Sequence, residues 1–273
     1  MCELFAMSSC HEVDVRFSLE AFSRRGGLEG PHKDGWGIAW YEEGDVRLVK
    51  EPHPAAGSAC VRFIQEHPFK TTLVLSHIRR ATQGGATLKN CQPFVRELGG
   101  RMHVFAHNGD LEAAALRAAL PLGSFRPVGD TDSEYAFCAL LEQLRPAWQR
   151  DAVTALDERL HVVAAFAAAL RPLGPANFLY ADGDALFVHG HRRFQPGATR
   201  ADPPGLHLLA RRCAAEHGAV DAAGLAVELG SEQSVVLAAS VPLTAEPGWR
   251  ALAEGELIAI RRGAVVFSSL HPA

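Results

Sequence analysis

The chain has 273 residues with a net charge of −4, and 48% of its residues are hydrophobic and 21% charged. These values are ordinary for a globular protein with enough apolar material for a core. The sequence contains no basic tract of five or more residues, which argues against nucleic acid as the main partner. No apolar run reaches the ~18 residues that a membrane span needs, so we expect no membrane partner.

Strands are expected at residues 1–9, 36–41, 46–50, 71–77, 102–106, 177–180, 186–190, 206–210, 234–240, 257–261 and 264–267. Helices are expected at residues 17–23, 59–66, 111–120, 132–144 and 153–170. The strands cluster in hairpins and do not alternate with helices. This order favours an α+β fold with antiparallel sheets and segregated helices. Because no internal repeat or long linker divides the chain, we expect a single domain over residues 1–273.

The cysteines suggest a reduced protein without a structural metal. No C-x-x-C pair occurs, and the spacing indicates neither a zinc site nor a compact disulfide framework. We therefore expect a cytoplasmic location, no metal and no cofactor. The six cysteines are Cys2, Cys10, Cys60, Cys91, Cys138 and Cys213.

The first reactive candidate is Cys2, which directly follows Met1. Cysteine is small, so removal of the initiator methionine is sterically easy and would leave an α-amine beside the thiol. An α-amine has a pKa of about 7.7–8.0, so near pH 7 it can take the thiol proton and generate the attacking thiolate. The alternative is a small buried residue at a strand start, and Cys2 taken alone favours that alternative.

Three further stretches carry candidate binding groups. Arg79 follows the strand expected at residues 71–77 and is suited to bind a carboxylate with both arms of its guanidinium, or else forms a surface ion pair. Asn108 and Gly109 end another expected strand, where an amide and an N–H can form an oxyanion hole or simply a turn. Asp132 begins an expected helix, where it serves as a cap or holds a substrate ammonium.

Together these groups describe a ligand with a carboxylate, an ammonium and a side-chain carbonyl, such as glutamine. The ordered set of Cys2, Ser-His-Ile-Arg-Arg-Ala-Thr, His-Asn-Gly and Asp-Thr-Asp-Ser-Glu resembles the class II glutamine amidotransferase domain of the N-terminal nucleophile hydrolases. The resemblance implies a four-layer αββα sandwich of two mainly antiparallel sheets.

The resemblance also implies a role for each matching residue. Cys2 would be the nucleophile and its amine the base, with Asn108 and Gly109 as the oxyanion hole. Arg79 would bind the substrate α-carboxylate, with Thr82 nearby. Asp132 would bind the α-amine, and Arg25 stands where the family has an arginine close to the nucleophile.

The sequence departs from the synthases of this family at two positions and in length. Arg80 replaces a tryptophan after the carboxylate-binding arginine, and Gln92 replaces a histidine before Pro93. No acceptor domain is recognisable. These departures and the Asp-Gly-Trp-Gly stretch at residues 34–37 make the chain more similar to stand-alone members, the YafJ-like group and the γ-glutamyl hydrolases of ergothioneine synthesis.

We therefore expect an amidohydrolase that cleaves the γ-amide of glutamine or of a γ-glutamyl compound through a thioester. The small-molecule substrate is the expected partner. Two alternatives stay open: a subunit that donates ammonia only to a separate acceptor enzyme, and a non-catalytic glutamine-binding module.

Overall fold

The strands form two large antiparallel sheets. The computed structural model describes residues 2–14, 32–148, 154–195, 197–213, 220–222, 225–227, 233–245 and 247–270. In these residues the seven-stranded sheet has the order β15-β11-β14-β1-β4-β2-β3 and the six-stranded sheet the order β17-β16-β8-β7-β6-β5.

The strands of the seven-stranded sheet are β1 (Glu3–Asp14), β2 (Trp36–Glu42), β3 (Asp45–Glu51), β4 (Lys70–Ile78), β11 (His207–Cys213), β14 (Gln233–Ala239) and β15 (Arg250–Ala251). The strands of the six-stranded sheet are β5 (Phe94–Leu98), β6 (Arg101–Gly109), β7 (Ala176–Ala181), β8 (Leu186–His189), β16 (Leu257–Arg261) and β17 (Ala264–Ser268). Two small pairs accompany them, β9 (Arg193–Phe194) with β10 (Ala201–Asp202) and β12 (Val220–Ala222) with β13 (Leu225–Val227).

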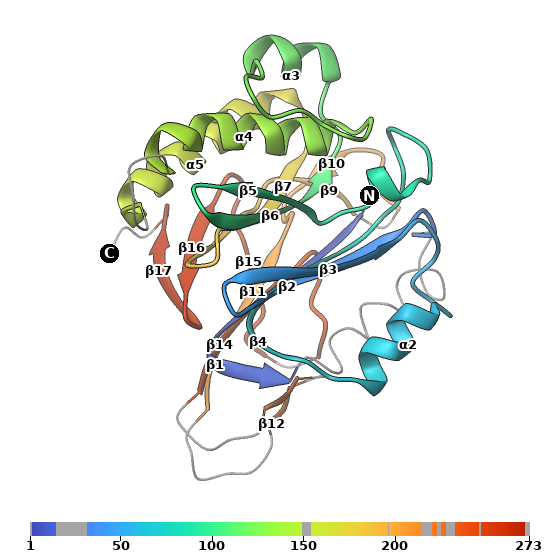
Figure 1. Ribbon diagram of the computed structural model, residues 1–273, viewed down its shortest axis with the longest axis vertical. Coiled ribbons are helices and arrows are strands. Elements are labelled where there is room, and N and C mark those ends of the chain that lie inside the picture. The colour runs from blue at the N-terminus through green and yellow to red at the C-terminus, as the bar shows by residue number, and fades with distance from the viewer. Residues whose placement is uncertain are drawn as a thin grey trace.

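The described helices cover the outer faces of the two sheets, as Figure 1 shows. Helices α4 (Asp132–Trp148) and α5 (Leu156–Leu170) pack on the six-stranded sheet, with α3 (Ala113–Ala119) beside α4. Helix α2 (Ala59–Glu66) packs on the far face of the seven-stranded sheet. The short 3-10 turns are η1 (Leu88–Asn90) and η2 (Arg171–Leu173). The predicted αββα layering is therefore observed. No helix of the described segments is long and apolar enough to span a membrane.

Strand alternation decides which side chains meet between the sheets. In β1, Leu4 and Ala6 belong to the apolar cluster between the sheets, whereas Phe5 and Met7 belong to the cluster under α2. Because side chains alternate along a strand, Cys2 has the same parity as Leu4 and lies on the inner side. In β6, Val104 and Ala106 lie in the same inner cluster, so Asn108 continues that row.

The structure corrects several predicted boundaries. Strand β6 runs to Gly109, so the Asn-Gly pair lies in the sheet opposite β7 and forms no turn. Strand β1 continues to Asp14 past an irregularity in its pairing with β4. Helix α3 begins at Ala113 and is capped by Glu112, because the Glu112 carboxylate accepts from the N–H groups of the first turn. Strand β5 was not predicted. The helix predicted at residues 17–23 lies outside the described residues. Residue 153, where the helix predicted at residues 153–170 would begin, also lies outside them.

Burial of His189 makes the free energy of unfolding depend on pH. His189 is fully buried, stacks on Phe178 and donates from Nδ1 to the carbonyl of Ala176 at 2.7 Å. Burial lowers the pKa of His189 from 6.5 to about 3. As pH falls, the His189 imidazole therefore binds a proton in the unfolded chain before it does so in the folded protein. The free energy of unfolding is thus highest above the pKa of His189 in the unfolded chain and declines below it.

We expect His189 alone to lower the free energy of unfolding by about 1 kcal/mol between about pH 7.5 and 5.5. Urea denaturation at the two pH values measures it. His189→Gln should flatten the pH dependence, whereas the exposed His53→Gln should leave it unchanged. Equal pH slopes for wild type and His189→Gln would contradict the assignment.

Candidate active site

Cys2 lies at the entrance to the space between the sheets, directly before β1. The thiol is bracketed by the backbone of Arg80, which follows β4: Sγ donates to the Arg80 carbonyl at 3.4 Å and accepts from the Arg80 N–H at 3.3 Å. Burial raises the pKa of the Cys2 thiol, partly offset by the Arg80 backbone and by the positive charge of Arg79. The thiol therefore needs a base to become a good nucleophile.

Asn108 contacts the nucleophile residue itself. Its Nδ2 donates to the Cys2 carbonyl at 2.6 Å and to Ser240 Oγ at 3.3 Å, and the side chain is fully buried. The following Gly109 cannot carry a side chain, because a Cβ there would lie 1.8 Å from the Pro175 carbonyl. The amide of Asn108 and the backbone of Gly109 thus lie together beside Cys2.

Arg79 is buried with 3% of its surface exposed, and its guanidinium points into the loop that follows β4. It donates to the carbonyls of Gln83, Gly84 and Gly85 at 2.8–3.1 Å and to that of Asp34 at 3.3 Å. These carbonyls are neutral acceptors. A substrate carboxylate would be a stronger partner for the same fork of donors.

Asp132 is the first residue of α4 and is 7% exposed. Its Oδ2 accepts from the N–H of Leu111 at 2.8 Å, and its Oδ1 accepts from Ser133 Oγ at 3.4 Å. Ser133 also contacts Nδ1 of His107 at 2.9 Å. Burial lowers the pKa of His107, and the nearby Asp132 carboxylate opposes part of this shift. The helix cap is Thr131, whose Oγ1 accepts from the Glu134 N–H.

A cavity of about 20 Å³ opens at the Cys2 thiol. Five predicted site residues line it: Cys2, Arg79, Thr82, Gly109 and Asp132. Asn108 is not among the lining residues but donates to the Cys2 carbonyl. Thr82 is exposed there. The volume suits one water molecule rather than an amino acid. Met1 and Arg25 lie outside the described residues, so the structure does not place them.

Three buried residues of this site were not predicted from the sequence. Gln92 lines the cavity and accepts from the N–H of His107 at 2.7 Å. Asn177, the partner of Asn108 across β6 and β7, donates to the Asn108 carbonyl at 2.9 Å. Ser240 accepts from the N–H of Leu4 at 2.9 Å. Along β7 and β14, every second side chain faces the apolar cluster between the sheets, and Asn177 and Ser240 are polar residues at the ends of these two rows. A polar residue in such a position is the sequence signal that could have indicated them.

Ser240→Ala should destabilise the protein, because the buried N–H of Leu4 loses its acceptor. We expect a loss of about 1–3 kcal/mol in the free energy of unfolding, measured by urea denaturation. The matched control is Ser269→Ala. Ser269 Oγ accepts from Leu257 N–H at 3.0 Å but is exposed, so water can replace it at little cost. An equal loss in both variants would contradict this expectation.

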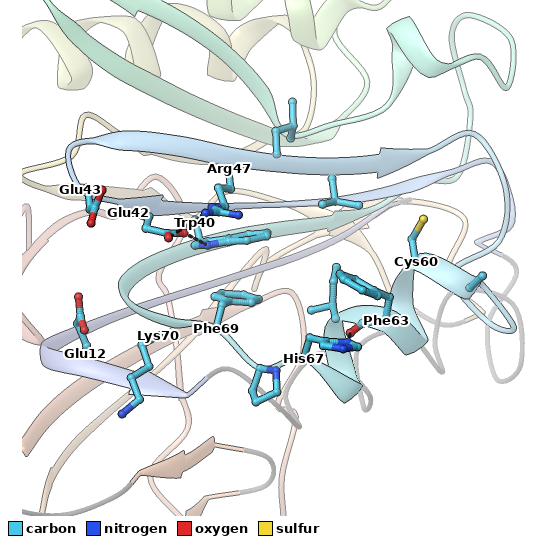
Figure 2. A pocket seen from close by; sticks show the side chains of 15 residues that line it. Glu12, Trp40, Glu42, Glu43, Arg47, Cys60, Phe63, His67, Phe69 and Lys70 are labelled. Atoms are coloured by element: carbon cyan, nitrogen blue, oxygen red, sulfur yellow. Dashed lines mark hydrogen bonds and ion pairs between the residues drawn. The ribbon is translucent and has the colours of Figure 1, made fainter.

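A larger hollow of about 1160 Å³ lies elsewhere, on the outer face of the seven-stranded sheet beside α2. Figure 2 shows its aromatic floor, where Trp40 and Phe69 stack with centroids 4.0 Å apart. Its cysteine, Cys60, has a thiol whose pKa is raised by burial and by Glu51. None of the site residues predicted from the sequence lines this hollow, whereas five of them line the smaller cavity at Cys2, which is therefore the better candidate site. Among the described residues, no three His, Cys, Asp or Glu side chains converge to hold a metal ion.

Comparison with known proteins identifies the family of this chain. A family model described as "Glutamine amidotransferases class-II" matches residues 1–273. The chain belongs to the class II glutamine amidotransferases. Within this family it is 35% identical over 260 residues to the Escherichia coli protein named "Putative glutamine amidotransferase YafJ", covering 94% of this chain and 96% of that protein.

Two solved structures share the fold of this chain. A crystal structure of a predicted glutamine amidotransferase from Pseudomonas aeruginosa superimposes with a TM-score of 0.69 at 31% identity, covering 97% of this chain and 99% of that one. Glutamine phosphoribosylpyrophosphate amidotransferase from B. subtilis superimposes with a TM-score of 0.57 at 17% identity, covering 98% of this chain and 49% of that one. The fold predicted for an N-terminal nucleophile hydrolase is thus confirmed.

Proposed function

We propose that this glutamine amidotransferase hydrolyses the γ-amide of glutamine or of a γ-glutamyl compound, with Cys2 as the nucleophile. The observation that carries the proposal is the cavity at the Cys2 thiol, where a buried arginine, a buried carboxylate and the Asn108-Gly109 pair converge. Arg79 binds the substrate α-carboxylate, Asp132 binds the α-ammonium and Thr82 lies beside them. Arg25 is retained as a substrate-binding candidate from the sequence.

The reaction needs no group beyond those of the chain, the substrate and water. Once Met1 is removed, the α-amine of Cys2 takes the thiol proton and Sγ attacks the γ-carbonyl carbon. Nδ2 of Asn108 and the N–H of Gly109 stabilise the oxyanion; one such donor is worth about 3–4 kcal/mol. The long contact of Nδ2 with Ser240 is the one that the oxyanion replaces.

Collapse of the tetrahedral intermediate breaks the carbon–nitrogen bond, and the ammonium of Cys2 gives its proton to the leaving nitrogen. Water then attacks the γ-glutamyl thioester, the amine takes a water proton, and glutamate and the free thiol result. Because the cavity is small, substrate binding requires the loop carbonyls of residues 83–85 to release the Arg79 guanidinium.

A glutamine-analogue electrophile, 6-diazo-5-oxo-norleucine, tests the proposal on the purified full chain. We expect intact-mass analysis to show loss of Met1 and one adduct, peptide mapping to place the adduct on Cys2, and glutamine to protect against labelling. Retention of Met1 or labelling elsewhere would overturn the mechanism. Glutamate release without any added enzyme supports hydrolysis; release only when an acceptor enzyme is added would favour an ammonia-donating subunit.

A further inference from the structure

The two adjacent arginines at the site, Arg79 and Arg80, have opposite environments. Arg79 is buried and its guanidinium is fully engaged with loop carbonyls. Arg80 is exposed and also lines the cavity at Cys2. Within the described parts of the chain, its guanidinium has no hydrogen bond or ion pair; its contacts are those of its backbone with the thiol. An arginine left unpaired at a cavity is available to a ligand.

The position of Arg80 relative to the nucleophile defines which part of a ligand it can reach. Its N–H and carbonyl both contact Cys2 Sγ, so its side chain starts beside the atom that is acylated. Under the proposed function, Arg79 and Asp132 hold the α-carboxylate and α-ammonium of the substrate. The γ-carbonyl then lies at Sγ, and the substituent on the leaving nitrogen extends away from that inner end. Asn108, which is fully buried and donates to the Cys2 carbonyl, closes the buried side of Cys2 and leaves the exposed side for this substituent.

We propose that Arg80 forms a subsite for an anionic leaving group, so that the preferred substrates are γ-glutamyl amino acids or peptides with a carboxylate near the scissile nitrogen. This inference rests on the proposed function. A guanidinium pairs with a carboxylate through two parallel hydrogen bonds, and such charge-assisted pairs contribute more than neutral ones. Because Arg80 is exposed, solvent and salt screen the pair, and we expect about a tenfold preference, equivalent to about 1.4 kcal/mol.

Two substrates that differ only in the charge of the leaving group test the subsite. Wild type should hydrolyse γ-glutamylglycine with about tenfold higher kcat/KM than γ-glutamylglycinamide, and added salt should reduce this ratio. Arg80→Gln keeps both backbone contacts to the thiol and should bring the ratio close to one. Arg80→Lys should give an intermediate ratio, since it keeps the charge but loses the fork of donors. Arg62→Gln on α2 makes the same change in net charge and should keep the wild-type ratio.

The outcomes separate this subsite from the proposed function. Equal kcat/KM for the two substrates in wild type, or an unchanged ratio in Arg80→Gln, would overturn the subsite while glutamine hydrolysis stands. Failure of wild type to hydrolyse glutamine and both γ-glutamyl substrates would overturn the proposed function and the subsite together.

Discussion

Cys2→Ala should reduce glutamate release from glutamine by about 10³-fold or more, because it removes the atom that forms the thioester. The protein should stay folded. Among the described residues, the hydrogen bonds of Cys2 Sγ are two long contacts with the Arg80 backbone. The Cys2 carbonyl, which accepts from Asn108 at 2.6 Å, remains in the variant. The measurement is coupled-enzyme detection of glutamate, with thermal unfolding on the same sample.

The matched control for this variant is Cys60→Ala, which removes another half-buried thiol on α2, on the opposite face of the seven-stranded sheet. It should keep wild-type glutamate release. Activity within a few-fold of wild type in Cys2→Ala would show that another residue attacks the amide. Loss of activity together with loss of the folded state would instead show that Cys2 is needed for stability.

Arg79→Lys should raise the KM for glutamine about 100-fold and change kcat less. Lysine keeps the positive charge but cannot bind the α-carboxylate through two parallel hydrogen bonds. The α-carboxylate is remote from the reacting carbonyl, so its binding energy is similar in the ground state and the transition state and appears mainly in KM. Steady-state kinetics over a wide range of glutamine concentration measures both constants.

A second variant separates substrate binding from the anchoring of the loop. Arg79 also holds the carbonyls of residues 83–85, and Gln83 fastens the same loop through Nε2 to Asp110 Oδ1 at 2.7 Å and to the Leu111 carbonyl at 3.1 Å. Gln83→Ala loosens the loop without removing the Arg79 guanidinium. A KM increase in Gln83→Ala as large as that in Arg79→Lys would assign the effect to the loop and contradict carboxylate binding by Arg79.

Individual elements show which parts of the fold could be predicted from the sequence. The strand at residues 71–77 was predicted to within one residue at each end, because its β-branched and apolar run is typical of a buried strand, and the helix at residues 59–66 has the predicted bounds. Strand β5 was not predicted, because Arg96 and Glu97 interrupt its apolar pattern. Antiparallel pairing with β6 holds this segment in the sheet. The Asn108-Gly109 dipeptide is typical of a turn, yet pairing with Asn177 and Ala176 keeps it in the sheet.

The family, the alternation of side chains along β1 and β6, and the residue types on which the proposed amino-acid site depends can all be read from the sequence. Those features are local, since they depend on residue order and a two-residue period. That Cys2, Arg79, Asn108 and Asp132 meet depends on the tertiary structure, because β1, β4, β6 and α4 are far apart in the chain and converge through sheet pairing and layer packing. It also decided the opposite environments of Arg79 and Arg80, since burial depends on the neighbouring elements and not on the side chain.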